Sequence, residues 1–131
     1  MKKLLLILLS ALFLASCGAS DEPADLRGNW AEADHTAEDT YMSAVVTDTT
    51  IEVYWTNDSE ESTSIYWIGT YTAPTESGDY TWESVKDAER TESALLASRD
   101  DTKTFTYSNG EITYSQSALG TTKTVHLVPA E

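Results

Sequence analysis

The sequence of 131 residues contains one cysteine, Cys17, so it cannot form an intramolecular disulfide. Basic residues are also scarce: 8 lysines and arginines stand against 22 aspartates and glutamates, which gives a formal net charge of −14. A surface with this charge repels nucleic acid and anionic lipid head groups, so we expect no nucleic-acid partner. Solubility is the simplest consequence of the charge. A cationic partner, or a bound divalent ion, is the more specific alternative.

The sequence lacks the motifs of common catalytic and metal sites. Its two histidines, His35 and His126, lie far apart, and neither a His-Glu-x-x-His motif nor a cysteine pair is present to support a zinc site. There is no Gly-x-Ser-x-Gly motif and no phosphate-binding glycine loop. The acidic stretch 32–39 around His35 has no regular calcium-loop spacing, so we expect a solvated loop. We therefore expect no metal, no cofactor and no catalytic residue; a pair of carboxylates brought together by folding is the remaining enzymatic alternative.

The N-terminus has the pattern of an export signal. Lys2 and Lys3 precede an apolar run from Leu4 to Leu9, and a second apolar segment, residues 11–15, follows Ser10. This core is shorter than the roughly 20 apolar residues that a membrane-spanning helix needs. A charged start with a short apolar core is typical of a secretory signal peptide.

The apolar core ends in Leu14-Ala15-Ser16-Cys17, which resembles the lipobox of bacterial lipoproteins. The resemblance implies cleavage before Cys17 and attachment of lipid to its thiol. It predicts a signal peptide at 1–16 and a lipidated acidic tether at 17–25. The remaining residues, 26–131, are expected to form a single domain, and their strand pattern predicts a β-barrel. The domain would face outside the cytoplasm, anchored to the cell membrane or an outer membrane. Cleavage would leave six basic residues against 22 acidic ones, a formal net charge of −16.

From Leu26 onward, short segments alternate apolar and polar residues with a period of two, which is typical of strands with one buried face. Asn109-Gly110 between two such segments predicts a hairpin, because both central positions of a type I′ turn need positive φ. Gly69 predicts a bulge or bend in its strand. The pattern predicts an all-β fold: an antiparallel up-and-down meander of eight or nine strands, closed or nearly closed into a barrel. The expected strands are 26–33, 41–47, 50–57, 63–73, 80–86, 102–107, 111–117 and 121–128. A ninth strand is expected at 93–98, where a short helical turn is the alternative.

The start of the first predicted strand, Arg27-Gly28-Asn29-Trp30, resembles the Gly-x-Trp signature of lipocalins and their calycin relatives. In that family the tryptophan closes one end of the barrel, and an arginine near the last strand lies over it. Here the last strand offers Lys123 instead. The chain is also shorter than typical lipocalins and lacks their C-terminal helix. The resemblance implies a lipocalin-like barrel architecture rather than membership of that family.

Aromatic residues concentrate in residues 54–82 and provide the candidate ligand-binding side chains: Trp55, Trp67, Tyr71 and Trp82. These rings can fill the barrel, or they can line a pocket that stacks on an apolar or sugar-like ligand. We expect a non-catalytic, membrane-anchored binding domain for such a ligand. The alternative is a protein-interaction or shielding lipoprotein, for example a prophage-encoded superinfection-exclusion factor.

Overall fold

A computed structural model describes residues 22–33, 35, 37–118 and 120–130 of the chain. These residues form eight antiparallel strands and one short helix, which confirms the predicted all-β meander. Within the same residues, no helix is long and apolar enough to cross a membrane. The elements are β1 (Gly28–Glu32), β2 (Thr40–Val46), β3 (Thr50–Asn57), β4 (Ser62–Thr70), β5 (Tyr80–Val85), α2 (Ala88–Thr91), β6 (Thr102–Ser108), β7 (Glu111–Ala118) and β8 (Thr121–Ala130).

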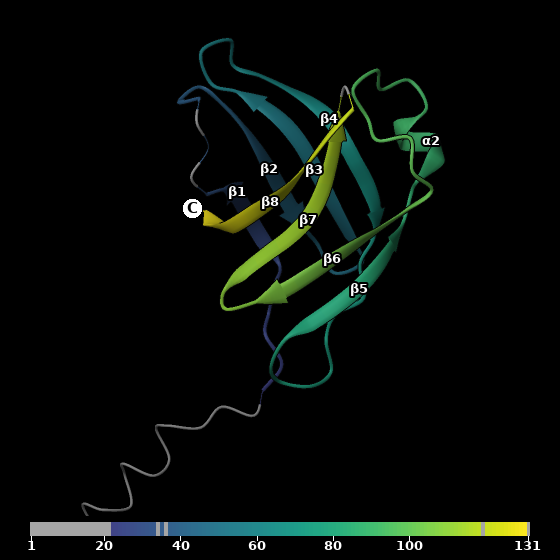
Figure 1. The fold of residues 1–131 in the computed structure, drawn as a ribbon. Coiled ribbons are helices and arrows are strands. Elements are labelled where there is room, and N and C mark those ends of the chain that lie inside the picture. The colour runs from purple at the N-terminus through teal and green to yellow at the C-terminus, as the bar shows by residue number, and fades with distance from the viewer. Residues whose placement is uncertain (1–21, 34, 36, 119, 131) are drawn as a thin grey trace, which may run out of the picture.

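The sheet curls into a nearly closed barrel. Its strand order is β4-β3-β2-β1-β8-β7-β6-β5, so the first and last strands of the chain are neighbours in the middle of the sheet. The curl brings the two outer strands, β4 and β5, toward each other (Figure 1). Among the described residues they meet through one isolated bridge, Gly69↔Lys86. The seam of the barrel therefore lies between β4 and β5.

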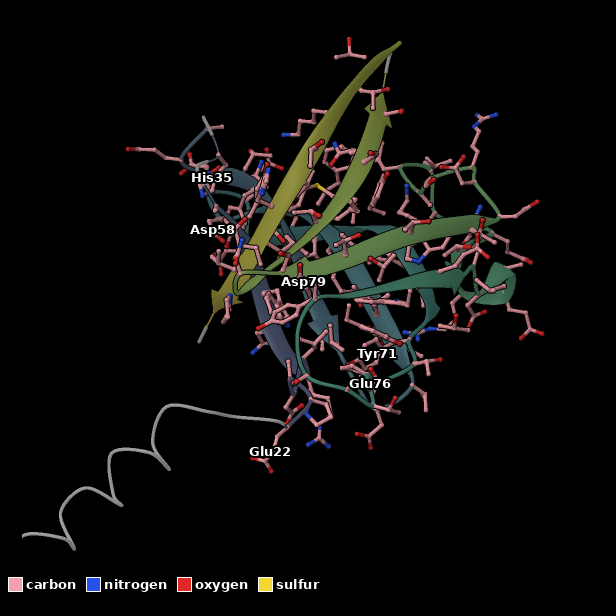
Figure 2. The ribbon with its side chains drawn as sticks, turned by 60° about the horizontal axis from the view of Figure 1, so that its bottom comes forward. Glu22, His35, Asp58, Tyr71, Glu76 and Asp79 are labelled. Atoms are coloured by element: carbon pink, nitrogen blue, oxygen red, sulfur yellow. The ribbon has the colours of Figure 1, made fainter. Side chains whose placement is uncertain are left out.

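Because neighbouring strands are antiparallel, their connections alternate between the two ends of the barrel. We call the end that holds the start of β1 and the connections 47–49, 71–79 and 109–110 the basal end. The other, apical end holds the described residues of the connections 33–39, 58–61, 86–101 and 119–120. In Figure 2, Glu22, Tyr71 and Glu76 mark the basal end, and His35 and Asp58 mark the apical end.

The barrel interior is filled by apolar and aromatic side chains from all eight strands. Alternation along each strand places these side chains inward and most of the threonines, serines and charged residues outward; Ser84 and Lys103 are buried exceptions. Full burial of one such aliphatic or phenyl group contributes about 1.5–3 kcal/mol. The side chains with no more than 1% exposure in this core are Leu26, Ile51, Val53, Trp67, Phe105, Ile112, Val125 and Leu127.

Trp30 closes the core at the basal end. Its indole N–H donates to the backbone oxygen of Leu26 at 2.8 Å, and its ring meets Tyr107 edge to face with 6.5 Å between centroids. Gly28 has a φ of +128°, a conformation that side-chain-bearing residues rarely adopt, and this turns the chain into β1. Lys123 does not contact Trp30 here; it pairs with Glu32 at 3.0 Å.

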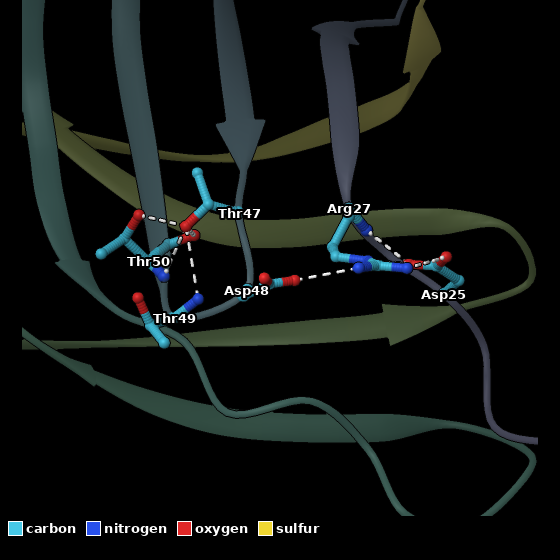
Figure 3. Close-up of polar contacts among 6 residues, drawn as sticks. All are labelled: Asp25, Arg27, Thr47, Asp48, Thr49 and Thr50. Atoms are coloured by element: carbon cyan, nitrogen blue, oxygen red, sulfur yellow. Dashed lines mark hydrogen bonds and ion pairs between the residues drawn. The ribbon is translucent and has the colours of Figure 1, made fainter.

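A polar bridge fixes the segment that leads into β1. The guanidinium of Arg27 contacts Asp25 and Asp48, each at 2.9 Å, so it joins the incoming chain to the turn between β2 and β3 (Figure 3). In that turn Thr47 Oγ1 accepts a hydrogen bond from the amide of Thr50 at 3.0 Å. Both features stabilise the basal end.

The bulge in β4 lies at Tyr66 rather than at Gly69, where the sequence suggested it. The β3–β4 register shifts between Val53, opposite Trp67, and Tyr54, opposite Ile65, which leaves Tyr66 as the extra residue. The bulge lets both Tyr66 and Trp67 point into the core. Gly69 serves the seam instead, because a Cβ there would lie 2.7 Å from the backbone oxygen of Val85 on β5.

The predicted strand at 93–98 is wrong. The β5–β6 connection contains the helix α2 at 88–91, and the segment 93–98 that follows it forms turns. Asp87 caps α2 by accepting from the amide of Arg90 at 3.1 Å. Two backbone hydrogen bonds, both 2.8 Å, tie the connection to β4: Asp87 N to Ile68 O and Ser98 N to Tyr66 O. The connection therefore covers the free edge of β4 without forming a ladder.

Candidate functional site

The structure separates the four predicted ligand-binding residues into two groups. Trp67, Tyr71 and Trp82 are 0%, 4% and 6% exposed and belong to the core. Trp82 stacks on Phe105 with 5.3 Å between centroids and meets Tyr71 edge to face at 5.1 Å. These three rings hold the barrel together. Trp55 is half-buried and lies apart from them at the apical end of β3.

Trp55 is held by two elements at the apical end. Its ring meets Tyr66 edge to face, with 5.7 Å between centroids and 88° between planes. Its indole N–H donates to the backbone oxygen of Leu96 at 3.1 Å, which attaches the β5–β6 connection to β3. The contact places Leu95 and Leu96 beside the ring.

An open pocket of about 710 Å³ lies between these elements. Trp55 and Tyr66 line it from β3 and β4, residues 95–100 line it from the β5–β6 connection, and Ser117 lines it from β7. Leu95 is 97% exposed and Leu96 is 56% exposed, although both are large apolar side chains. Hollows at the basal end are smaller, about 490 and 510 Å³, and are lined partly by the leading residues Glu22–Ala24. The apical pocket is the stronger candidate because it combines space with exposed apolar groups.

A buried cation lies next to the pocket. Lys103 on β6 is 92% buried, and its ammonium is 5.2 Å from the centre of the Tyr66 ring and 5.6 Å from that of Trp67. It also donates to the backbone oxygen of Ser115 at 3.1 Å and pairs with Asp100 at 3.5 Å. Cation–π contacts and one carboxylate therefore replace the water that the ammonium loses.

Two further polar groups in this region have no hydrogen-bond partner. The hydroxyl of Tyr114 and the Oε1 of Gln116, both inward-facing on β7, are buried and unpaired. Loss of solvent is the main reason why the pKa of Tyr114 is raised well above its ordinary value. Tyr114 therefore keeps its proton and remains a hydrogen-bond donor at neutral pH.

The apical end is strongly acidic. The described residues of its four connections carry ten carboxylates against three basic side chains. The carboxylates are Glu38, Asp39, Asp58, Glu60, Glu61, Asp87, Glu89, Glu92, Asp100 and Asp101; the basic residues are Lys86, Arg90 and Arg99. The field at this end attracts cations and repels anions.

The two histidines lie in separate places. The ring of His35 stacks on Tyr41 with 5.0 Å between centroids, and His126 contacts Glu111 at 2.9 Å. Glu32, from the acidic stretch around His35, is directed to Lys123 and to the amide of Met42, while Asp34 lies outside the described residues. Within the described part of the chain, no group of three or more histidines, cysteines and carboxylates is placed to hold a metal ion.

The sequence did not predict most of the residues that line the pocket. Leu95 and Leu96 were assigned to a strand, and period-two alternation puts Tyr66 on the face opposite Trp67, because it does not predict the bulge in β4. Ser117 offered no signal at all. The adjacent pair Leu95-Leu96 departs from the period-two alternation of a strand with one buried face, but a short apolar run is also consistent with a fully buried strand. Comparisons with protein-family models, curated proteins and solved structures gave no match for this chain.

Proposed function

We propose that this protein is a lipid-anchored, non-catalytic binding module of the cell envelope, and that its apical pocket takes an apolar ligand. One observation carries the proposal: Trp55, Leu95 and Leu96 form an apolar surface around an open pocket of about 710 Å³. Large apolar groups left exposed in one place are typical of binding surfaces. A sugar needs polar groups along the edges of its ring, but the lining of this pocket exposes more apolar than polar surface. An apolar ligand is therefore favoured over a sugar.

The anchor and the pocket lie at opposite ends of the proposed molecule. Residues 22–27 lead into β1 at the basal end, so lipid on Cys17 would tether the barrel by that end. The pocket lies at the apical end, between the β5–β6 connection, residues 86–101, and the apical end of β7. It would therefore face away from the membrane, toward ligands that arrive from outside.

The binding proposal can be tested with a neutral fluorescent probe, N-phenyl-1-naphthylamine. The four tryptophans of the full chain are replaced by 5-fluorotryptophan, and the ¹⁹F resonance of Trp55 is identified with Trp55→Phe. We expect the probe to shift the Trp55 resonance and to leave the three core tryptophans unchanged. In the double variant Leu95→Ser, Leu96→Ser, at least a tenfold higher probe concentration should be needed to produce the same shift.

Val85→Ser is the matched control, because Val85 is also a large exposed apolar side chain, at 52%, but lies on β5 outside the pocket. It should leave probe binding unchanged. Equal binding by the double serine variant and the wild-type chain would contradict the proposal, and so would the absence of any shift at Trp55.

The anchor is tested separately with Cys17→Ser, which removes the predicted lipid attachment. The variant should leave the membrane fraction or remain uncleaved, and the intact mass of the wild-type protein should include the added acyl chains. A mature-sized Cys17→Ser protein that stayed firmly in the membrane fraction would overturn the anchor.

A further inference from the structure

The barrel wall separates between β6 and β7. These strands pair at three positions only, Thr106↔Thr113, Tyr107↔Ile112 and Ser108↔Glu111, all near the basal end. Toward the apical end, β6 continues to pair with β5 as far as Thr102, and β7 continues to pair with β8 as far as Ala118. Figure 1 shows the two strands diverging from their shared turn. The upper half of β7 therefore has a strand neighbour on one side only.

The side of β7 that faces the gap carries backbone hydrogen-bonding groups. The backbone oxygen of Ser115 points toward β6, because it accepts a hydrogen bond from the Lys103 ammonium. Peptide groups alternate along a strand, so the amide and carbonyl of Ser117 point the same way. Ser117 also lines the apical pocket. The free edge thus leads directly into the apolar site.

We infer that this free edge of β7 accepts an extended segment of a partner polypeptide, with apolar side chains that enter the apical pocket and basic side chains between them. The inference rests on the proposed function of the pocket and names its ligand class. A strand added to an exposed edge obtains main-chain hydrogen bonds from the edge and specificity from a pocket beside it. β7 provides both the exposed edge and the adjacent pocket, because Ser117 belongs to the edge and also lines the pocket.

The alternation of a strand sets the pattern of the partner. Every second side chain of the added segment points toward the barrel interior, where Trp55, Tyr66 and Leu96 offer apolar contacts. The buried Tyr114 hydroxyl and Gln116 Oε1, which have no partner, lie on the same stretch of β7. The side chains between the apolar ones face solvent.

Charge selects the identity of the solvent-facing side chains. The connections around the gap belong to the apical end, with its ten carboxylates and three basic residues, on a chain of net charge −14. An acidic segment would be repelled on approach, and a basic one attracted. The partner segment is therefore one that alternates lysine or arginine with apolar residues.

The test uses an acetylated, amidated heptapeptide that alternates lysine and leucine, titrated into the full chain. Two N-methylated versions of the peptide make the test specific to strand addition: one methylates the leucine amides, the other the lysine amides. Only alternate amides of an added strand face β7. We expect one version to bind at least tenfold more weakly than the parent and the other to bind as well as the parent.

Protein variants test the same edge from the other side. Ser117→Pro removes the amide that faces the gap, while Gln116 and Ala118 still pair with β8. It should weaken peptide binding at least tenfold, whereas Ser117→Ala, which keeps the amide, should bind like the wild type. Both variants lose the hydroxyl contact with Thr122, so they differ only in the backbone. If Ser117→Pro does not fold, the N-methylated peptides decide the question without it.

The outcomes separate this inference from the proposed function. Slower hydrogen exchange at Ser115 and Ser117 in the peptide complex, together with the difference between the two methylated peptides, supports strand addition. Equal binding of both methylated peptides shows attraction by charge alone and overturns the inference. No peptide binding, with N-phenyl-1-naphthylamine still shifting Trp55, overturns the peptide partner and leaves the apolar pocket standing. Failure of both probes overturns the inference and the proposed function together.

Discussion

The indole N–H of Trp67 donates a hydrogen bond to the hydroxyl of Ser84 across 3.0 Å, and this bond joins β4 to β5 at the seam of the barrel. Both groups are fully buried. The strands share one isolated bridge here instead of a ladder, so side-chain contacts hold the seam. The ring of Trp67 also lies 5.9 Å from the Lys86 ammonium, the bridge residue on the β5 side.

Ser84→Ala should lower the free energy of unfolding by about 1–3 kcal/mol, because it leaves the Trp67 N–H buried without an acceptor. Thr81→Ala on the same strand is the control: its hydroxyl contacts Thr106 at the surface, and its removal should change stability by no more than about 0.5 kcal/mol. Urea unfolding followed by tryptophan fluorescence measures both. Similar losses in the two variants would show that the seam does not depend on this bond.

Gly69→Ala should destabilise the protein by about 1–3 kcal/mol, the usual range for overpacking. The new methyl group would lie 2.4 Å from Ser84 Oγ and 2.7 Å from the backbone oxygen of Val85, so β4 and β5 must separate. Adding Ser84→Ala removes only the first clash, and the double variant should therefore remain less stable than Ser84→Ala alone. Thermal unfolding measures the series, and an unchanged midpoint in Gly69→Ala would contradict the close approach.

Gly110→Val should lower stability by about 1 kcal/mol or more. Asn109 and Gly110 have φ values of +54° and +84°, as the predicted type I′ turn requires, and a β-branched residue resists this conformation. No atom lies within 4 Å of a Cβ built at Gly110, so the loss comes from the backbone alone. Gly110→Asn is the control, because asparagine tolerates positive φ. Equal melting temperatures for the two variants would argue against this explanation.

Arg27→Gln should raise the pKa of Asp25. Hydrogen bonds from the Arg27 side chain and backbone, with its charge, lower this pKa from 3.8 to about 2. The bridge therefore stabilises the folded protein above about pH 4 and loses its effect as the pH falls toward 2. Both side chains are well exposed, so the change in stability is small and salt-sensitive. Carboxyl ¹³C titration of Asp25 measures the shift; Arg90→Gln, which breaks the ion pair with Glu52 instead, should leave Asp25 unchanged.

The local pattern of the chain was enough to predict most strands. Period-two alternation placed β2, β3, β6 and β7 to within about two residues, because one face of each strand meets the core and the other meets water. The Asn109-Gly110 turn was predicted for the same local reason, since few residues adopt positive φ. The prediction of a strand at 93–98 was wrong because a short apolar run fits a strand or an exposed turn equally well.

The candidate site was harder to predict. The sequence indicated that the aromatic residues of 54–82 matter, but burial, not identity, decides which of them can meet a ligand. Trp67 and Trp82 entered the core, whereas Trp55 stayed at the rim. The bulge at Tyr66 then turned a second aromatic side chain inward, toward the pocket. A one-residue shift in register changes the face of every following residue, and no local signal marked its place.

The sequence by itself determined the all-β meander, its main turns, its acidity and the lack of an intramolecular disulfide, because each of these depends on neighbouring residues or on composition. Only the tertiary structure decided where the barrel closes, where β6 leaves β7, and that Leu95 and Leu96 lie beside Trp55. These features depend on contacts between residues far apart in the sequence, such as the 41 positions that separate Trp55 from Leu96 and the 91 that separate Glu32 on β1 from Lys123 on β8. Such contacts form only when the whole sheet has curled, since the packing of all eight strands fixes which edges meet.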